Sequence, residues 1–514
     1  MTQPDPTPAP SSPAPAGHRA RAGWLPAPVR KWGKFVLRWT IAVVGIGWVV
    51  LNTPLYDKVT TLDGDNRPIK VTLAEDVGDR ITSAKIIDPV TGAVRQVSRD
   101  QLVNPPDTKW VEVREPSGVQ RRRLLALDLS DDLKAVRRLL VENPGGKGAW
   151  VTPERVEKYE LGVPFPLVDQ GIVPMVRQAD RGYLWAAVLI FPVTFLITGL
   201  RWHLLLTAVD IGIGAAKSFV INMVGAFYNT FMPGSTGGDV LKAYYAAKLN
   251  PGHRTRAVMS VIVDRAIGLL GLIILGGAMA GYLATSPHVA GDAVAERCAQ
   301  VAIGAGVIVL CTVGGLLVLF TPVLRRATGL DFILRRMPMQ EQVGKAIHTL
   351  ELYRQRPALV LGTLVMTFPV HITVIFSAMC AGMAFGLPLT PGYYWVVVPV
   401  VVLAGAVPIS PQGAGVMEFF AILLTRKQGC TVSQAFALTM SIRLVQIFWN
   451  LWGGLFVMRG GYHAPTPKEQ ASVEHDDAAD AAPPVSAGQP APAQPAGLSP
   501  RVGDAPTGVA PSAP

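Results

Sequence analysis

Residues 227–248 read FYNTFMPGSTGGDVLKAYYAAK, a run of turn-forming and polar residues set between apolar segments. Gly234, Gly237 and Gly238 allow backbone conformations that other residues avoid. Pro233 cannot continue a helix, because it lacks a backbone N–H and its ring collides with the preceding turn. The sequence therefore predicts that a helix breaks here and a second helix starts after the glycines.

The composition is that of a membrane protein with sizeable polar parts, since 50% of the 514 residues are hydrophobic and 16% are charged. Inside a bilayer, non-helical backbone is tolerated only where protein or a water-filled cavity satisfies its polar groups. The break thus has two interpretations. It is a helix start on a cytoplasmic loop, with Asp239 at the positive end of the helix dipole, or it is a binding site within the membrane.

The two ends of the chain are polar and rich in Pro and Ala. Residues 1–28 and 464–514 cannot bury a core, and we expect both segments to be disordered. A basic cluster ending at Arg38 overlaps the start of an apolar run, which we interpret as an uncleaved transmembrane helix over residues 29–51. The positive-inside rule then places the amino and carboxyl termini in the cytoplasm.

Residues 52–180 are soluble in character, with balanced charges and strand-like alternation. We predict a small α+β domain outside the cytoplasmic membrane, with a helix over residues 131–142 that Ser130 caps. The charge run Arg121–Arg123 is either a solvated strand edge or a contact for an anionic headgroup. Asp63-Gly64-Asp65 has the form of a metal-binding motif, but its surroundings favour a turn.

The remaining apolar runs predict further transmembrane helices, at residues 183–206, 257–283, 298–320, 359–380 and 432–458. Arg201 and His203 are expected to mark the cytoplasmic end of the first of these. Residues 321–357 carry seven Lys and Arg against three Asp and Glu, which places this loop in the cytoplasm. The four cysteines lie in or beside apolar segments, so neither a disulfide framework nor a zinc site is indicated.

Asp264 and Arg265 lie well inside one predicted span, where each costs about 2.5–3.5 kcal/mol at a helix centre. Both side chains are therefore expected to face the protein interior. Neighbouring positions on a helix diverge by about 100°, so we expect the two to serve different partners. They form either a structural ion pair with other helices or part of a functional site.

A second broken segment, VPISPQGAGVMEFF, occupies residues 407–420. The apolar runs before the two breaks, 215–231 and 395–407, are shorter than the roughly 20 residues needed to cross a bilayer. Each break carries an acid that an arginine follows 25 or 26 residues later, in the order Asp239, Arg265, Glu418, Arg443. We predict inverted repeats over residues 184–283 and 359–458, each with a re-entrant hairpin that turns near the membrane midplane.

Four motifs occur in a fixed order: RWHLLL, the stretch at 227–248, AVMSVIVDRAIGLL, and VPISPQGAGVMEFF followed by SIRLVQIFWNLWGG. This set resembles the lysylphosphatidylglycerol synthase transmembrane family, also called the flippase-like domain family, over residues 184–458. The resemblance implies an inner-membrane protein that handles polar lipids. Members translocate aminoacylated phosphatidylglycerol, and relatives are linked to polyprenyl-phosphate sugar donors. The aminoacyltransferase domain of the synthases is not expected after residue 458, where a polar tail follows.

Two positions depart from the family pattern. Lys242 stands where the family commonly has an arginine three residues after the first acid, and Met417 replaces the arginine that commonly precedes the second acid. A lysine cannot bind a phosphate in the bidentate manner of arginine, and methionine carries no charge. The choice of headgroup is therefore open from the sequence.

We expect an all-α polytopic membrane protein with an inserted α+β extracytoplasmic domain, in which residues 183–458 bind and translocate an anionic or zwitterionic lipid. The lipid partner is a phospholipid or a polyprenyl-phosphate lipid, and neither a cofactor nor a nucleic acid is expected. Two alternatives stand beside this hypothesis. One is a group transferase that uses a lipid phosphate, with one of the acids as base. The other is a membrane scaffold for an envelope complex, which docks a partner through residues 52–180.

Candidate lipid-binding residues come from both breaks and from the ionisable positions near them. The arginines would attract a phosphate, and the broken backbone would offer N–H groups to it. The acids would pair with the arginines, receive an ammonium group or carry a proton. No catalytic or metal-binding residue is assigned. The candidates are Asn229, Pro233, Gly234, Ser235, Gly237, Gly238, Asp239, Lys242, Asp264, Arg265, Pro408, Ser410, Gly413, Gly415, Glu418 and Arg443.

Overall fold

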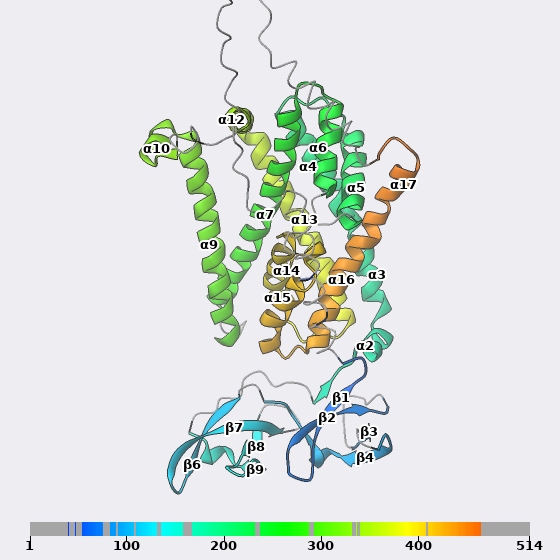
Figure 1. The fold of residues 1–514 in the computed structure, drawn as a ribbon, viewed down its shortest axis with the longest axis vertical. Helices are drawn as coiled ribbons and strands as arrows, with labels where there is room; N and C mark the ends of the chain where they lie inside the picture. Colours follow the sequence, from blue (N-terminus) through cyan, green and yellow to red (C-terminus); the bar gives the residue numbers. More distant parts are fainter. Residues whose placement is uncertain are drawn as a thin grey trace, which may run out of the picture.

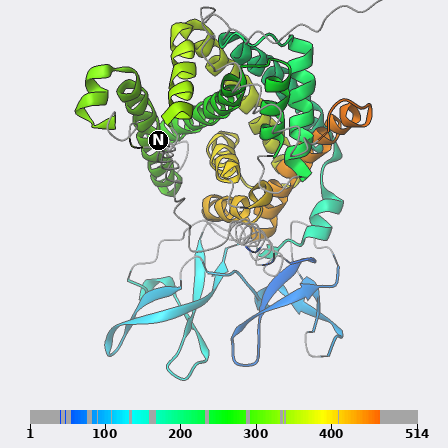
Figure 2. The same ribbon diagram turned by 45° about the horizontal axis from the view of Figure 1, so that its top comes forward.

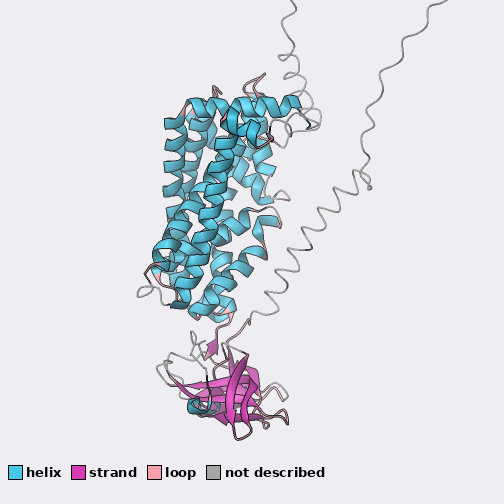
Figure 3. Cartoon of the chain, turned by 90° about the vertical axis from the view of Figure 1, so that its left-hand side faces the viewer, coloured by secondary structure: helices cyan, strands magenta, loops and turns pink. Residues whose placement is uncertain are grey.

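A helical bundle carries a strand-rich unit at one end (Figure 1). The computed structural model describes residues 54–75, 83–88, 91–106, 109–130, 135–157, 167–231, 237–286, 292–330, 340–407 and 410–463, with the single residues 40, 47 and 336. The predicted terminal segments 1–28 and 464–514, and nearly all of the predicted helix 29–51, lie outside these residues. Figure 3 shows the helices as one block with the strands beyond one end of it.

Two antiparallel sheets form the strand-rich unit and lie side by side (Figure 2). The first has the order β10-β1-β2-β3-β4 with β5 paired to β1, and the second has the order β6-β7-β8-β9. The strands are β1 Lys58–Leu62, β2 Pro68–Leu73, β3 Ser83–Ile87, β4 Val94–Ser98, β5 Leu102–Val103, β6 Trp110–Glu115, β7 Gly118–Leu129, β8 Val136–Glu142, β9 Gly148–Val151 and β10 Val168–Asp169. Two short 3-10 helices, Arg99–Gln101 and Pro153–Arg155, and the helix α2, Ile172–Gln178, complete the region.

The predicted helix over residues 131–142 is wrong, because residues 136–142 form the strand β8. Leu139 and Val141 pack into one hydrophobic cluster, while Leu140 between them packs into another on the opposite face of the sheet. Both faces of β8 are covered, so the consecutive residues Leu139, Leu140 and Val141 are all apolar and buried. Such a run lacks the alternation of a half-exposed strand and is therefore mistaken for the apolar face of a helix. The Oγ of Ser130 instead accepts a hydrogen bond from the N–H of Ala135 at 3.0 Å, and residues 131–134 of the predicted helix lie outside the described residues.

The arginine run lies in the part of β7 that pairs with β6, whereas β8 pairs with the residues after the run, Leu124–Leu129. The run therefore has a strand on one side only, as expected of a strand edge. Arg122 donates to both carboxylate oxygens of Glu115 across the sheet, at 3.0 and 3.1 Å. The prediction of a turn at Asp63-Gly64-Asp65 is confirmed. The carboxylate of Asp63 accepts hydrogen bonds from the backbone N–H groups of Asp65 and Arg67, at 2.9 and 2.7 Å.

Four of the described helical segments are long and apolar enough to cross a membrane, and they confirm four of the predicted spans. They are Arg181–Ala208, α7 Arg254–Ala284, Val294–Phe320 within α9 Asp292–Phe320, and α13 Pro357–Ala384. The first consists of α3, Arg181–Ile190, and α4, Pro192–Ala208. The fifth predicted span, 432–458, is not among the four. It forms α16, Val432–Leu451, and α17, Gly453–Met458.

Two pairs of shorter helices lie between the long ones. They are α5 Ala215–Phe231 and α6 Gly237–Lys248, and α14 Pro391–Ala406 and α15 Val416–Thr425. The first pair lies in the half of the bundle away from the strands and the second in the half near them (Figure 1). Two polar helices, α10 Pro322–Ala327 and α12 Gln340–Gln355, cover the end opposite the strands.

The strand assignment of β8 predicts the effect of truncating Leu139, whose side chain is fully buried. Leu139→Ala should lower the free energy of unfolding of the strand-rich unit by about 2–5 kcal/mol, through lost burial and an unfilled cavity. Hydrogen exchange of the β7 and β8 amides in the full chain measures this loss. Val119→Ala, at a half-exposed position on β7, is the matched control. Equal protection in both variants would contradict the two-sided burial of β8.

Candidate functional site

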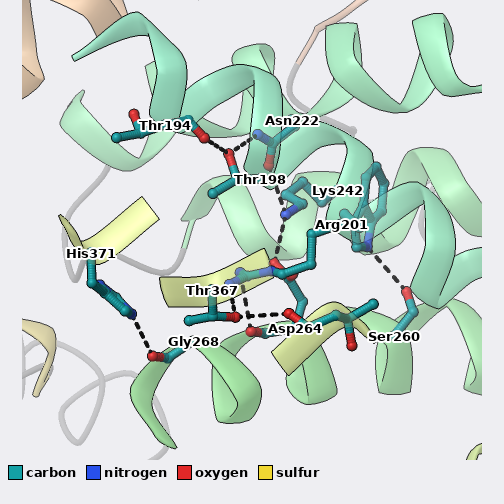
Figure 4. Close-up of polar contacts among 12 residues, drawn as sticks. Thr194, Thr198, Arg201, Asn222, Lys242, Ser260, Asp264, Gly268, Thr367 and His371 are labelled. Atoms are coloured by element: carbon teal, nitrogen blue, oxygen red, sulfur yellow. Dashed lines mark hydrogen bonds and ion pairs between the residues drawn. The ribbon is translucent and has the colours of Figure 1, made fainter. Parts of the chain in front are cut away.

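One buried carboxylate joins three helices, and its arginine partner contacts a fourth (Figure 4). Asp264 of α7 accepts a hydrogen bond at Oδ1 from Nε of Arg201 on α4, and Nη2 of the same arginine lies 2.9 Å from Oδ1. Its Oδ2 lies 3.5 Å from the ammonium of Lys242 on α6. Arg201 also donates to the hydroxyl of Thr367 on α13 at 3.0 Å. Asp264, Arg201 and Lys242, each at most 6% exposed, form what we call the central cluster.

Lys242 has further partners besides Asp264. Its ammonium donates to Oδ1 of Asn222 at 3.0 Å and lies 4.6 Å from the centre of the Trp202 ring. Asn222 in turn donates to the hydroxyl of Thr198 at 3.1 Å, which fixes the orientation of its amide (Figure 4). The lysine stem crosses α5 at Gly225, where a Cβ would lie 2.8 Å from Cγ of Lys242. A side chain at Gly225 would therefore displace the ammonium from Asp264.

The start of α6 is fixed by its contact with α5. The N–H of Gly238 donates to Oδ1 of Asn229 at 2.8 Å, which satisfies one of the free donors at the helix start. A Cβ at Gly238 would collide with the carbonyl of Gly225, so only glycine permits this approach. Gly237 is the first residue of α6. Pro233, Gly234 and Ser235 lie outside the described residues.

A second ion pair lies beside the central cluster. Nη2 of Arg265 on α7 is 2.8 Å from Oδ2 of Asp239 on α6. The side chains of Asp264 and Arg265 thus have different partners, as predicted from their angular separation. The expectation that Arg265 faces the protein interior is wrong, because its side chain is 49% exposed. The rotation of about 100° that carries Asp264 into the bundle carries Arg265 toward its surface.

A third ion pair joins the two helices that follow the second break. Oε1 of Glu418 on α15 lies 2.9 Å from Nη1 of Arg443 on α16, and both side chains are buried. The other oxygen of Glu418 accepts the N–H of Gly415 at 2.7 Å, which caps the helix start. Arg443 donates from Nη2 to the sulfur of Met417 at 3.7 Å. Among the described residues, Nε of Arg443 and the hydroxyl of the buried Ser410 have no hydrogen-bond partner.

The backbone of the second break turns sharply and reaches the first half of the chain. Gln412, Gly413 and Gly415 have positive φ angles of 49°, 68° and 83°, the left-handed region that glycine adopts without strain. Nε2 of Gln412 donates to the carbonyl of Thr230, near the end of α5, at 3.0 Å. The second break therefore touches the helix that leads into the first. Pro408 lies outside the described residues.

The ion pairs outside the central cluster occupy matching positions. Asp239 and Glu418 are each the third residue of the second short helix of their pair, α6 and α15. Arg265 and Arg443 are each the twelfth residue of the following long helix, α7 and α16. The spacing noted in the sequence thus corresponds to two ion pairs with the same placement.

Sequence reasoning missed the role of Arg201. It was expected to mark a cytoplasmic helix end, yet the structure buries it inside α4 and pairs it with Asp264. The available signal was an arginine within RWHLLL that apolar residues flank on both sides. Asn222 and Thr367 were also missed, since a neutral polar residue in a helix carries no comparable signal. No group of three or more His, Cys, Asp or Glu able to hold a metal occurs in the described part of the chain.

The apolar helices around buried ion pairs define a multi-pass α-helical membrane protein. Residues 170–453 match the family described as lysylphosphatidylglycerol synthase TM region. A UPF0104 membrane protein of Methanothermobacter thermautotrophicus is 25% identical over 299 residues, which cover 54% of this chain and 84% of the relative. A UPF0104 membrane protein of Pyrococcus horikoshii is 25% identical over 104 residues, which cover 20% of this chain and 31% of the relative. The chain belongs to the lysylphosphatidylglycerol synthase transmembrane region family, which confirms the resemblance.

The central cluster predicts an order of stabilities among charge-removing variants. Asp264→Asn leaves two buried cations without a carboxylate and should lower the free energy of unfolding by about 3–5 kcal/mol. Arg201→Met leaves Asp264 paired with Lys242 and should cost less. Arg265→Gln, in the half-exposed pair, should cost under about 1 kcal/mol. Thermal unfolding of the detergent-purified variants gives the order. Equal loss in Asp264→Asn and Arg265→Gln would contradict a structural role for the cluster.

Proposed function

We propose that the protein translocates a polar lipid between the two leaflets of the cytoplasmic membrane, and that its headgroup passes between the two breaks. The observation that carries this proposal is the contact of the second break with the end of α5, through Gln412 and Thr230. Non-helical backbone at membrane depth is tolerated only inside protein or beside a water-filled cavity, and paired charges there mark substrate pathways. Both features meet here, with the Asp239–Arg265 pair in one half and the Glu418–Arg443 pair in the other.

The proposal includes inverted repeats with two re-entrant hairpins. In each half a long helix precedes two short ones and another long helix follows them. The helices α5, of 17 residues, and α14, of 16, are shorter than the roughly 20 residues needed to span. The pair α5–α6 and the pair α14–α15 lie toward opposite ends of the bundle (Figure 1), which supports entry from opposite faces.

The unequal exposure of the matching ion pairs supports alternating access. The Arg265 side chain is 49% exposed, whereas that of Arg443 is 9% exposed. A transporter that opens its two halves in turn has one half accessible and the other closed at any moment. In this proposal the structure represents the state in which the half containing α6 is open and the half containing α15 is closed.

Transport accounts for the acids better than group transfer does. A general base needs a carboxylate free to take a proton from the reacting group. Asp239, Asp264 and Glu418 each lie within 3.5 Å of a cationic nitrogen, so none of the three carboxylates is free of a partner in the way that a general base requires. We therefore prefer a lipid transporter to a transferase for this site.

We propose that the strand-rich unit lies outside the cytoplasm and that α10, α12 and both chain termini lie inside. The basic residues around α10 and α12 gather at the end of the bundle opposite the strands, as the positive-inside rule requires of short loops. A soluble unit of this size crosses the membrane largely regardless of its charge.

This orientation is tested by labelling single cysteines introduced at exposed positions, Ser98→Cys in β4 and Gln342→Cys in α12, in a background without the native cysteines. An impermeant thiol reagent applied to intact cells should modify Ser98→Cys and leave Gln342→Cys unmodified. Permeabilised cells, in which both positions react, provide the control. Modification of Gln342→Cys alone in intact cells would reverse the proposed orientation.

Transport itself is tested with Arg265→Ala, because this half-exposed pair can lose its arginine without leaving a fully buried charge. Proteoliposomes with a fluorescent phospholipid should lose protein-dependent translocation, measured by quenching from outside, while insertion of the variant stays normal. Arg354→Ala, at an exposed surface pair, is the control. Arg443→Ala should also lower stability, since it leaves the fully buried Glu418 unpaired. Undiminished translocation by Arg265→Ala would rule out a role for this arginine.

A further inference from the structure

The central cluster holds more positive than negative charge. Its single carboxylate, Asp264, lies between the two cations Arg201 and Lys242. Arg201 takes the closer contact at 2.9 Å, and Lys242 lies at 3.5 Å with the neutral amide of Asn222 as its nearer acceptor. Buried charges in proteins are normally balanced by a partner of opposite sign. Lys242 is therefore the cation without a carboxylate of its own, and an anion would complete the cluster.

The neighbouring acids cannot balance this surplus, because each already has a cation. Asp239 is paired with Arg265, and Glu418 is paired with Arg443 and also caps the start of α15. A cationic headgroup would need a carboxylate to receive its ammonium group. On these described helices, each of the three acids would have to lose its cationic partner before it could receive that ammonium group.

The second half of the bundle offers donors that are not used within the described chain. Arg443, which is 8% exposed, has no acceptor there for its Nε–H, and its Nη2 meets only the weakly accepting sulfur of Met417. Ser410, which is 1% exposed, has no partner there for its hydroxyl. Unused buried donors suit a group rich in acceptor oxygens, and a phosphodiester is such a group.

We infer that the transported lipid carries a net-anionic phosphodiester headgroup and that Lys242 determines this specificity. The inference rests on the proposed function and narrows it, since it excludes zwitterionic and cationic headgroups as preferred ligands. Lys242 lies three residues after Asp239 on the same face of α6, and its side chain is more deeply buried, at 6% exposed against 17% for Asp239. A phosphate that enters at the half-exposed Arg265 therefore meets Lys242 next.

The inference is tested with the full chain in nanodiscs that contain equal amounts of phosphatidylglycerol, phosphatidylethanolamine and lysyl-phosphatidylglycerol. Native mass spectrometry after release from the nanodisc reports which lipid stays bound. Phosphatidylglycerol should exceed each of the others by roughly tenfold. Lys242→Met should lose this preference, and Lys242→Arg, which keeps the charge, should retain it. Lys217→Met, at an exposed position at the start of α5, should behave like the natural chain.

Water-soluble probes distinguish a lipid headgroup from a free anion. Glycerophosphoglycerol or inorganic phosphate at millimolar concentration should displace less than half of the bound phosphatidylglycerol if the acyl chains contribute to binding. Complete displacement by inorganic phosphate would show a simple phosphate site and overturn the lipid assignment. Undiminished preference in a folded Lys242→Met variant, verified by its thermal unfolding, would overturn the role of Lys242.

The outcomes also separate this inference from the proposed function. Translocation combined with a preference for the lysyl headgroup would leave the proposed function standing and overturn the anionic assignment. Selective binding of phosphatidylglycerol without translocation in proteoliposomes would support the assignment and contradict transport. Failure to retain any of the three lipids would overturn the anionic assignment, while the proteoliposome assay would decide translocation separately.

Discussion

The bundle depends on the carboxylate of Asp264 on α7, because that group pairs with cations on α4 and α6, and its partner Arg201 extends the contact to α13. The helix α6 contacts this carboxylate through Lys242. Two ion pairs with opposite arrangements of charge join α6 to α7. In one, Asp239 of α6 pairs with Arg265 of α7, and in the other, Lys242 of α6 pairs with Asp264 of α7. A slip of α6 by one turn would bring Lys242 toward Arg265, and this repulsion restricts the two helices to one register.

Signals that are local in the sequence predicted much of this arrangement. Four of the transmembrane helices follow from apolar runs, and α6 starts at Gly237, within the glycines of the predicted break. The acid-to-arginine spacing was also informative, since both spaced pairs, Asp239–Arg265 and Glu418–Arg443, are ion pairs in the structure. A spacing that recurs within one chain can be recognised without knowledge of the tertiary fold.

Features that depend on what covers a segment were not predictable in the same way. In β8, Leu139 and Leu140 are both buried because a hydrophobic cluster lies on each face of the sheet, and no local pattern reveals two-sided cover. Arg201 was placed at a helix end because arginine is common there, whereas its partner Asp264 is 63 residues away. The exposure of Arg265 likewise follows from the packing of α7, which the sequence does not specify.

The two halves of the bundle have the same order of long and short helices but differ in charge. This difference bears on the direction of lipid transport in the proposed cycle. The half containing α6 has the surplus cation Lys242, while the half containing α15 has the uncharged Met417 against Arg443. A second arginine at Met417 would place two guanidinium groups together beside the single carboxylate of Glu418. With methionine there, the Glu418–Arg443 pair is neutral and can close without an anion. A headgroup phosphate would therefore be held more strongly at the α6 half than at the α15 half, and that gradient favours release from the α15 half once it opens.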